Sequence, residues 1–161
     1  MFVILAEIIS RMKNMKKIAI VFLIVVLSGC TVAGKKKDID IYQEALTVVA
    51  MSSGDVEPEV TIINIPSHGV LPDQLVIGLG GGAHAQQLRD ILIELKHTEN
   101  NWALMIGDNP SLDYAVIANA VKELDLTGVQ IVYSNKDSKR TKIGQAIKQT
   151  GAEFYFIDRQ Y

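Results

Sequence analysis

The sequence predicts an α/β domain with a mostly parallel sheet and helices on both faces. Two observations lead to this class. Short, continuously apolar segments alternate with longer segments in which apolar residues recur at helical spacing. The last three short segments begin at residues 102, 129 and 153, with Gly128 and Gly151 just before the last two. This spacing suits successive strand–helix units, and strands that are apolar throughout are typical of parallel sheets covered on both faces.

The composition suits one packed domain. Of the 161 residues, 48% are hydrophobic and only four are proline, which argues against disorder. A single cysteine cannot form an internal disulfide. From Cys30 to the end the chain carries 12 basic and 17 acidic side chains. Such an acidic domain lacks the positive footprint that nucleic-acid binding needs, so no nucleic-acid partner is expected.

The first part of the domain predicts an N-terminal β-hairpin. Residues 45–51 and 59–65 are rich in β-branched side chains and flank a turn-rich segment at residues 52–55. A helix beginning within residues 39–49 is the alternative. Residues 74–79 form a third short apolar run, which we expect to be a strand that leads into a glycine-rich turn and a helix.

From residue 83 onward, helices and strands are expected to alternate. Apolar residues at helical spacing predict the first of these helices. Residues that favour helix N-termini, Asp108, Asn109, Asp137 and Ser138, precede the next two. The expected elements are a helix at 83–97, a strand at 102–107, a helix at 111–124, a strand at 129–134, a helix at 139–150 and a strand at 153–158.

Residues 12–30 have the parts of an export signal. Three lysines, Lys13, Lys16 and Lys17, precede ten uninterrupted apolar residues at 18–27. That run is well short of the ~20 residues that a transmembrane helix needs. Because the signal is complete from Met12, we expect translation to start at Met12 or Met15. The apolar run ends in the sequence LSGC, residues 27–30, which contains the only cysteine of the chain.

The LSGC sequence resembles the lipobox of bacterial lipoproteins. The resemblance implies that a lipid is attached to the Cys30 thiol, that the chain is cleaved before Cys30, and that the new amine is also acylated, for example with palmitate. The chemistry agrees, because a thiolate is a good nucleophile and two or more acyl chains anchor a protein stably. A buried free cysteine near a transmembrane segment is the alternative.

The resemblance divides the chain into a signal peptide at residues 1–29, a lipidated tether at 30–37 and a single periplasmic α/β domain at 38–161. In enteric-type lipoproteins, aspartate directly after the modified cysteine favours retention in the inner membrane. Thr31 holds that position here. The resemblance therefore implies an outer-membrane anchor facing the periplasm, with the inner membrane as the alternative. The three lysines at 35–37 are expected to be solvated, or to contact anionic lipid headgroups.

A glycine-rich segment at Gly80, Gly81 and Gly82 raises the question of an anion site. Together with Gly78 it matches G-x-G-x-x-A, and a helix N-terminus binds anions readily. A dinucleotide fingerprint also needs an acidic residue about 20 residues further on. Asp108 lies 30 residues after Gly78, and an exported protein does not normally meet cytosolic NAD or FAD. We therefore expect a turn that needs the backbone freedom of glycine, with a site for another anionic group or a glycan as the alternative.

The candidate ligand crevice lies at the carboxyl ends of the predicted strands, where parallel sheets bind ligands. It comprises Gly80, Gly81, Gly82, His84, Asp108, Asn109 and Asn135. The three histidines lack metal-ligand spacing, so no metal or cofactor is expected. The chain also lacks the G-x-S-x-G and H-E-x-x-H motifs. We expect a non-enzymatic binding or accessory module of the envelope, with an envelope protein or a glycan as partner. The alternative is a periplasmic hydrolase with Asp108 and His84 as its acid–base pair.

Residues 103–134 also resemble the strand–helix–strand core of ExbD/TolR periplasmic domains. That core has a tyrosine early in the helix and a glycine before the next strand, as Tyr114 and Gly128 are placed here. The chain departs from the family in having a predicted lipoprotein signal in place of a membrane helix, and in a further helix and strand. The resemblance therefore implies a shared architecture only.

Overall fold

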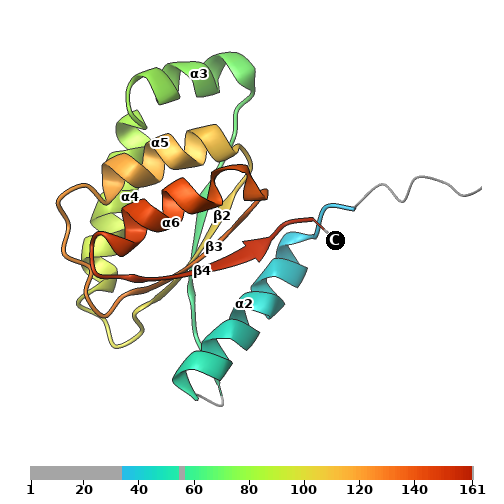
Figure 1. The fold of residues 1–161 in the computed structure, drawn as a ribbon, viewed down its shortest axis with the longest axis vertical. Coiled ribbons are helices and arrows are strands. Elements are labelled where there is room, and N and C mark those ends of the chain that lie inside the picture. Colours follow the sequence, from blue (N-terminus) through green and yellow to red (C-terminus); the bar gives the residue numbers. More distant parts are fainter. Residues whose placement is uncertain (1–33, 55–56, 161) are drawn as a thin grey trace, which may run out of the picture. The chain divides into compact units, whose positions relative to one another are not determined.

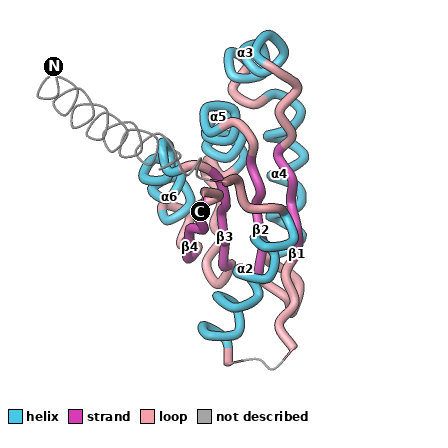
Figure 2. The backbone as a smooth tube through the Cα atoms, turned by 90° about the vertical axis from the view of Figure 1, so that its right-hand side faces the viewer, coloured by secondary structure: helices cyan, strands magenta, loops and turns pink. Residues whose placement is uncertain are grey.

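The computed structural model describes residues 34–54 and 57–160, and the compact unit of the chain begins at Lys35. Its sheet has four parallel strands in the order β1-β2-β3-β4 (Figure 2). The strands are β1 (Thr61–Ile65), β2 (Trp102–Gly107), β3 (Gln130–Asn135) and β4 (Glu153–Asp158). The predicted α/β class with a parallel sheet is confirmed. The predicted signal peptide and Cys30 lie outside the described residues.

Helices cover both faces of the sheet (Figure 1). One face packs against three helices that connect consecutive strands, and the other face packs against the first helix of the unit. Right-handed connections between neighbouring strands in sequential order bring their helices to the same face. The helices are α2 (Asp38–Ser53), α3 (Val70–Gly78), α4 (Gly82–Leu95), α5 (Pro110–Ala120) and α6 (Arg140–Lys148), with a 3-10 turn, η1, at Asp137–Lys139.

The alternation of side chains along β2 explains why this strand is apolar throughout. Ala103 and Met105 belong to the core on the α4–α6 side, whereas Leu104 and Ile106 belong to the core on the α2 side. All four are buried. Because both faces are covered, every position of the strand favours an apolar residue.

The predicted N-terminal hairpin is wrong, because residues 45–51 lie in α2 and only the second of its two predicted strands exists. Ile41, Ala45 and Val49 recur every four residues and are buried against the sheet, which is the pattern of one helix face. The helix ends at Gly54, whose φ of 77° and N–H bond to the carbonyl of Ala50 form a left-handed cap. The burial of this stripe outweighs the β preference of its branched side chains. The helix alternative for residues 39–49 is correct.

The predicted strand at residues 74–79 is also wrong, because residues 70–78 form α3. A short apolar run alone does not distinguish a strand from a buried helix segment. Here Val76 and Ile77 pack against the core while Leu75 is exposed, as on a helix with one covered face. The predicted elements after residue 83 are confirmed, with small changes at their ends: α5 stops at Ala120, and β3 begins one residue later than expected.

Candidate functional site

A buried carboxylate lies at the carboxyl edge of the sheet. Asp113, in the first turn of α5, is fully buried. Its Oδ2 accepts hydrogen bonds from the Tyr133 hydroxyl at 2.7 Å and from the Asn135 amide. Gly107 leaves room for this carboxylate, because a Cβ added there would lie 1.7 Å from the Asp113 Oδ2. We call Gly107, Asp113, Tyr133 and Asn135 the Asp113 cluster.

Burial changes the protonation of this cluster. Desolvation raises the pKa of Asp113 to about 6, and the hydrogen bonds from Tyr133 and Asn135 oppose the shift only in part. The same burial, together with the neighbouring Asp113, raises the pKa of Tyr133. The second carboxylate oxygen of Asp113 has no hydrogen-bond partner among the described residues. The sequence analysis missed Asp113, although its spacing from Val116, Ile117 and Ala120 places it on the buried face of α5.

A second cluster surrounds Arg159, at the end of β4. Its side chain is only 7% exposed. One guanidinium nitrogen donates to the carbonyl of Gly107 and to Asp108 Oδ1 at 2.8 Å, and the other donates to Asp38 Oδ1 at 2.7 Å. Lys35 donates to the same oxygen of Asp108 at 3.0 Å. Arg159 therefore ties the start of the compact unit to its last strand.

Asp108 is held as a structural carboxylate by these two cations. The hydrogen bond from Lys35, followed by the charge of Arg159, lowers the pKa of Asp108. The 35–37 segment itself contacts the unit. The backbone N–H of Lys36 donates to the carbonyl of Arg159 at 2.9 Å, and the Lys36 ammonium pairs with Glu44 at 2.6 Å.

A third cluster fixes α3 to the rest of the fold. Asp73, in the first turn of α3, is 2% exposed and accepts the Ser67 hydroxyl at 2.6 Å and the backbone N–H of His68 at 2.9 Å. Asn109 caps α5 through its amide oxygen and donates to Asp73 Oδ2 at 2.8 Å. These hydrogen bonds, chiefly the one from Ser67, lower the pKa of Asp73. Asn109 is thus used in joining two helices.

The predicted glycine turn connects two helices rather than a strand and a helix. Gly80, Gly81 and Gly82 all have positive φ, and Asn119 of α5 donates to the carbonyl of Gly80 at 2.6 Å. A Cβ on Gly81 would lie 2.8 Å from the Cα of Val116. The glycines therefore serve the backbone conformation of the turn and its close approach to α5. The strand that a dinucleotide fingerprint requires before the turn is replaced by α3.

His84 and Asp108 do not form the predicted acid–base pair among the described residues. Its ring centroid is 6.3 Å from that of His68, and the side chain lines a cavity of about 70 Å³ beside Ile65 and Leu88. Neither a hydrogen bond nor an ion pair joins His84 to Asp108 in the described part of the chain. The structure thus gathers Asp108, Asn109 and Asn135 at one edge, each with a partner inside the fold.

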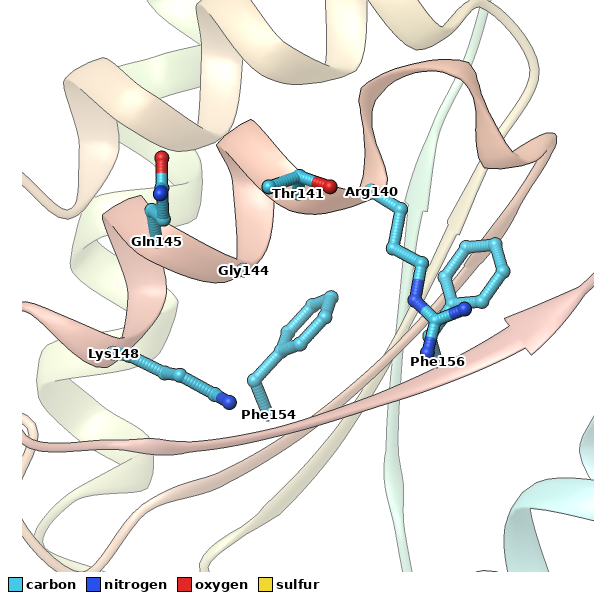
Figure 3. A pocket seen from close by; sticks show the side chains of 7 residues that line it. All are labelled: Arg140, Thr141, Gly144, Gln145, Lys148, Phe154 and Phe156. Atoms are coloured by element: carbon cyan, nitrogen blue, oxygen red, sulfur yellow. The ribbon is translucent and has the colours of Figure 1, made fainter.

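An open groove between α6 and β4 was not predicted (Figure 3). Phe154 and Phe156 of β4 point from the strand into this groove, whose volume is about 270 Å³, and a cation stands at each end of it. The guanidinium of Arg140 lies 4.8 Å from the ring centroid of Phe156. Gly144 leaves space for Phe154, because a Cβ there would lie 2.9 Å from the ring. The lining residues are Arg140, Thr141, Gly144, Gln145, Lys148, Phe154 and Phe156.

This chemistry suits an anionic partner with an apolar or flat portion. Arg140 and Lys148 can pair with a negative group, while the two phenyl rings offer faces for stacking. Neither phenylalanine was among the predicted site residues. Their alternation with Tyr155 and Ile157 could have indicated that they share one face of the last strand.

The fold and these sites define a class: an α/β protein whose single parallel sheet carries buried polar clusters at its carboxyl edge. No protein-family model, curated protein or solved structure matches the chain. Within residues 34–54 and 57–160, no group of three or more metal-ligating side chains is arranged around a common point. In the same residues no helix has the length and apolarity required to cross a membrane.

Proposed function

We propose that this chain is a lipid-anchored envelope protein, with a non-enzymatic α/β domain that serves as a binding or accessory module. The observation that carries the proposal is the LSGC sequence at residues 27–30, placed directly after ten apolar residues and a lysine-rich start. The lipid on Cys30 holds the domain on a membrane facing the periplasm. Thr31 favours the outer membrane, with the inner membrane as the alternative.

Binding is favoured over catalysis by the way the acidic side chains are used. A general base must reach a proton of the substrate, and its pKa should lie near the working pH. Asp108 has a lowered pKa and is paired with two cations, and Asp113 is fully buried. The hydrolase alternative depended on a pair of Asp108 and His84, which no hydrogen bond joins.

The surface that best suits a partner is the α6–β4 groove. Its two phenyl rings and two cations would receive an anionic group of an envelope protein or glycan. Aromatic and arginine side chains are enriched among the residues that dominate binding energies.

Metabolic labelling with an alkyne fatty acid tests the anchor. The wild-type protein should take up the label, and Cys30→Ser should not, because the acceptor thiol is lost. Equal labelling of both proteins would overturn the proposal.

Crosslinking in intact envelopes, followed by co-purification, tests the groove. Arg140→Glu together with Lys148→Glu should strongly reduce the yield of the crosslinked partner. Lys142→Glu is the matched control, because Lys142 lies on the same helix but is placed over Tyr114 rather than in the groove. If the control loses the partner as strongly as the groove variant does, the groove is not the binding surface.

A further inference from the structure

Helix α3 exposes an apolar face that the described part of the chain leaves uncovered. Leu71 and Leu75 of α3, and Leu79 directly after the helix, follow one another every four residues and are 80%, 71% and 75% exposed, and Val70 beside them is 77% exposed. We call these four residues the α3 leucine face. The opposite side of the helix packs against the core and α5. The exposed side chains are therefore presented by a helix that is held in place.

The segment of the chain that carries this face is poor in charged side chains. Between residues 60 and 87 the chain contains one charged residue, Asp73, with histidine counted as neutral. Asp73 is buried in its hydrogen-bond cluster. Large exposed apolar patches on soluble domains mark contacts with another protein or with a membrane. Either a protein or a membrane can therefore cover the α3 leucine face.

The point where the chain enters the compact unit favours the membrane. Lys35 is fixed to the unit through Asp108 and through a backbone bridge to Gln160. Cys30 stands five residues earlier, and five residues span at most about 18 Å even when fully extended. A lipid on Cys30 would therefore hold Lys35 within about that distance of the bilayer.

The entry point and α3 lie at the same edge of the sheet. Lys35 contacts Asp108, and the next residue, Asn109, donates to Asp73 in the first turn of α3. In Figures 1 and 2, α3 lies beyond the carboxyl ends of the strands. An anchor that holds this edge at the bilayer also brings the α3 leucine face to the bilayer.

We infer that the α3 leucine face is a second membrane contact, which docks into the headgroup boundary beside the lipid anchor. The inference rests on the proposed lipidation of Cys30. Interfacial helices bury their apolar face ~5–10 Å deep. The anchor keeps the helix at a high effective concentration near the bilayer, so a contact of modest intrinsic affinity suffices.

A fluorescent probe on α3 tests this inference in the lipid-anchored protein. Leu75→Cys is purified from membranes, labelled with an environment-sensitive dye, and reconstituted into vesicles of phosphatidylethanolamine and phosphatidylglycerol that carry a shallow nitroxide lipid. The lipidated Cys30 has no free thiol to react. The exposure of Leu75 makes the substitution tolerable for the fold, and Leu71→Cys provides a second probe position on the same face.

The matched control is Met51→Cys. Met51 is 82% exposed, and it lies at the end of α2, where Val49 and Ser53 line a surface with Trp102 and Gln130 from the starts of β2 and β3. It is thus an exposed apolar residue at the opposite edge of the sheet. The emission of the probe at residue 75 should shift to shorter wavelength, and the nitroxide should quench about half of it. This is expected because an interfacial helix places its apolar face at the depth of the shallow nitroxide. The probe at residue 51 should show neither change.

The outcomes separate this inference from the proposed function. An alkyne-labelled protein with an unquenched probe at residue 75 keeps the lipid anchor but overturns the membrane contact. A protein without the lipid label overturns the anchor, and with it the inference. A probe at residue 75 that shifts without quenching, and responds instead to dilution of the protein in the vesicles, assigns the face to a second copy of the chain and also overturns the inference.

Discussion

Two regions that pack on helix α5 distribute polar and apolar side chains in opposite ways. At the first turn of α5, the carboxylate of Asp113 is fully buried among Gly107, Tyr133 and Asn135. On α3, which contacts α5, and directly after it, three leucines are each more than 70% exposed. The polar group lies inside and the apolar groups lie outside.

The difference distinguishes side chains that stabilise the fold from side chains that are exposed and free to contact a partner. The hydrogen bonds that the Asp113 cluster makes all lie within the unit, so these residues are explained by the architecture of the fold. The exposed leucines bury little apolar surface within the unit, so their apolar character indicates a contact outside it. Of the four predictions that follow, the first concerns the glycine turn after α3, the next two ask whether the buried polar clusters stabilise the fold, and the last asks whether the exposed leucines contribute to its stability.

The largest effect is expected at the turn between α3 and α4. Gly81→Ala should lower the free energy of unfolding by about 4 kcal/mol, because a Cβ would meet the Val116 backbone at 2.8 Å and a φ of 91° strains an alanine. Gly78→Ala is the control, since its Cβ would meet nothing within 4 Å and its φ is not positive. It should change stability by less than about 0.5 kcal/mol in denaturant unfolding. Similar effects of the two substitutions would contradict this account of the turn.

The Asp113 cluster should make stability depend on pH. The pKa of Asp113 rises from 3.8 in the unfolded chain to about 6 in the fold. Its favourable contribution is therefore complete below pH 3.8 and is lost as pH rises through 6. Asp113→Asn keeps an oxygen that can accept from Tyr133 and Asn135 but cannot ionise.

This substitution should therefore gain stability relative to the wild type as pH rises from 4 to 7, by about 3 kcal/mol in total. Denaturant unfolding of both proteins across this range provides the measurement. Parallel stability curves would mean that the buried carboxyl titrates normally.

Arg159 should be more important for stability than its neighbour Lys35, although both pair with Asp108. Arg159→Gln should cost about 2 kcal/mol, because it removes a buried hydrogen bond to the Gly107 carbonyl and part-buried hydrogen bonds to two carboxylates. Lys35→Gln should cost less than about 0.5 kcal/mol, because that side chain is 60% exposed and its ion pair is solvated. Thermal and denaturant unfolding of both variants compare them, and equal costs would show that Arg159 acts only as a surface charge.

The smallest effect is expected on the α3 leucine face. Leu75→Ser should change the free energy of unfolding by less than about 0.5 kcal/mol, because the side chain is 71% exposed. Leu92→Ala, at a fully buried site on α4, should cost about 3 kcal/mol. If Leu75→Ser destabilised the domain as strongly as Leu92→Ala, the leucine face would belong to the core and would need no outside partner.

The sequence predicted the second half of the fold well because its signals are local. The strands at 102–107 and 153–158 were predicted at their observed boundaries, since each is a short apolar run between turn residues. Strands were predicted at residues 45–51 and 74–79, where the structure has α2 and α3. Short runs of β-branched or apolar residues fit a strand or a helix equally well until the buried side of the segment is known. In α2 the burial of Ile41, Ala45 and Val49 on one helix face decided the outcome, whereas in α3 only Asp73 is buried and Val76 and Ile77 are partly buried.

The sites were harder to predict because their partners are distant in the chain. Asp113 meets Tyr133 and Asn135 across 20 and 22 residues, and Arg159 meets Asp38 across 121. Asp108, Asn109 and Asn135 were correctly expected at the carboxyl edge, as the ends of parallel strands require. Their engagement with Arg159, Asp73 and Asp113 depends on side-chain geometry that no local pattern encodes.

We propose above that the domain is held on a membrane by a lipid on Cys30. Intact-mass and peptide mass spectrometry of the protein extracted from envelope membranes tests it most directly. We expect a chain that begins at Cys30 and carries a diacylglyceryl group on its thiol and an acyl group on its amine. A chain that begins at Met1, Met12 or Met15 with an unmodified Cys30 would contradict it.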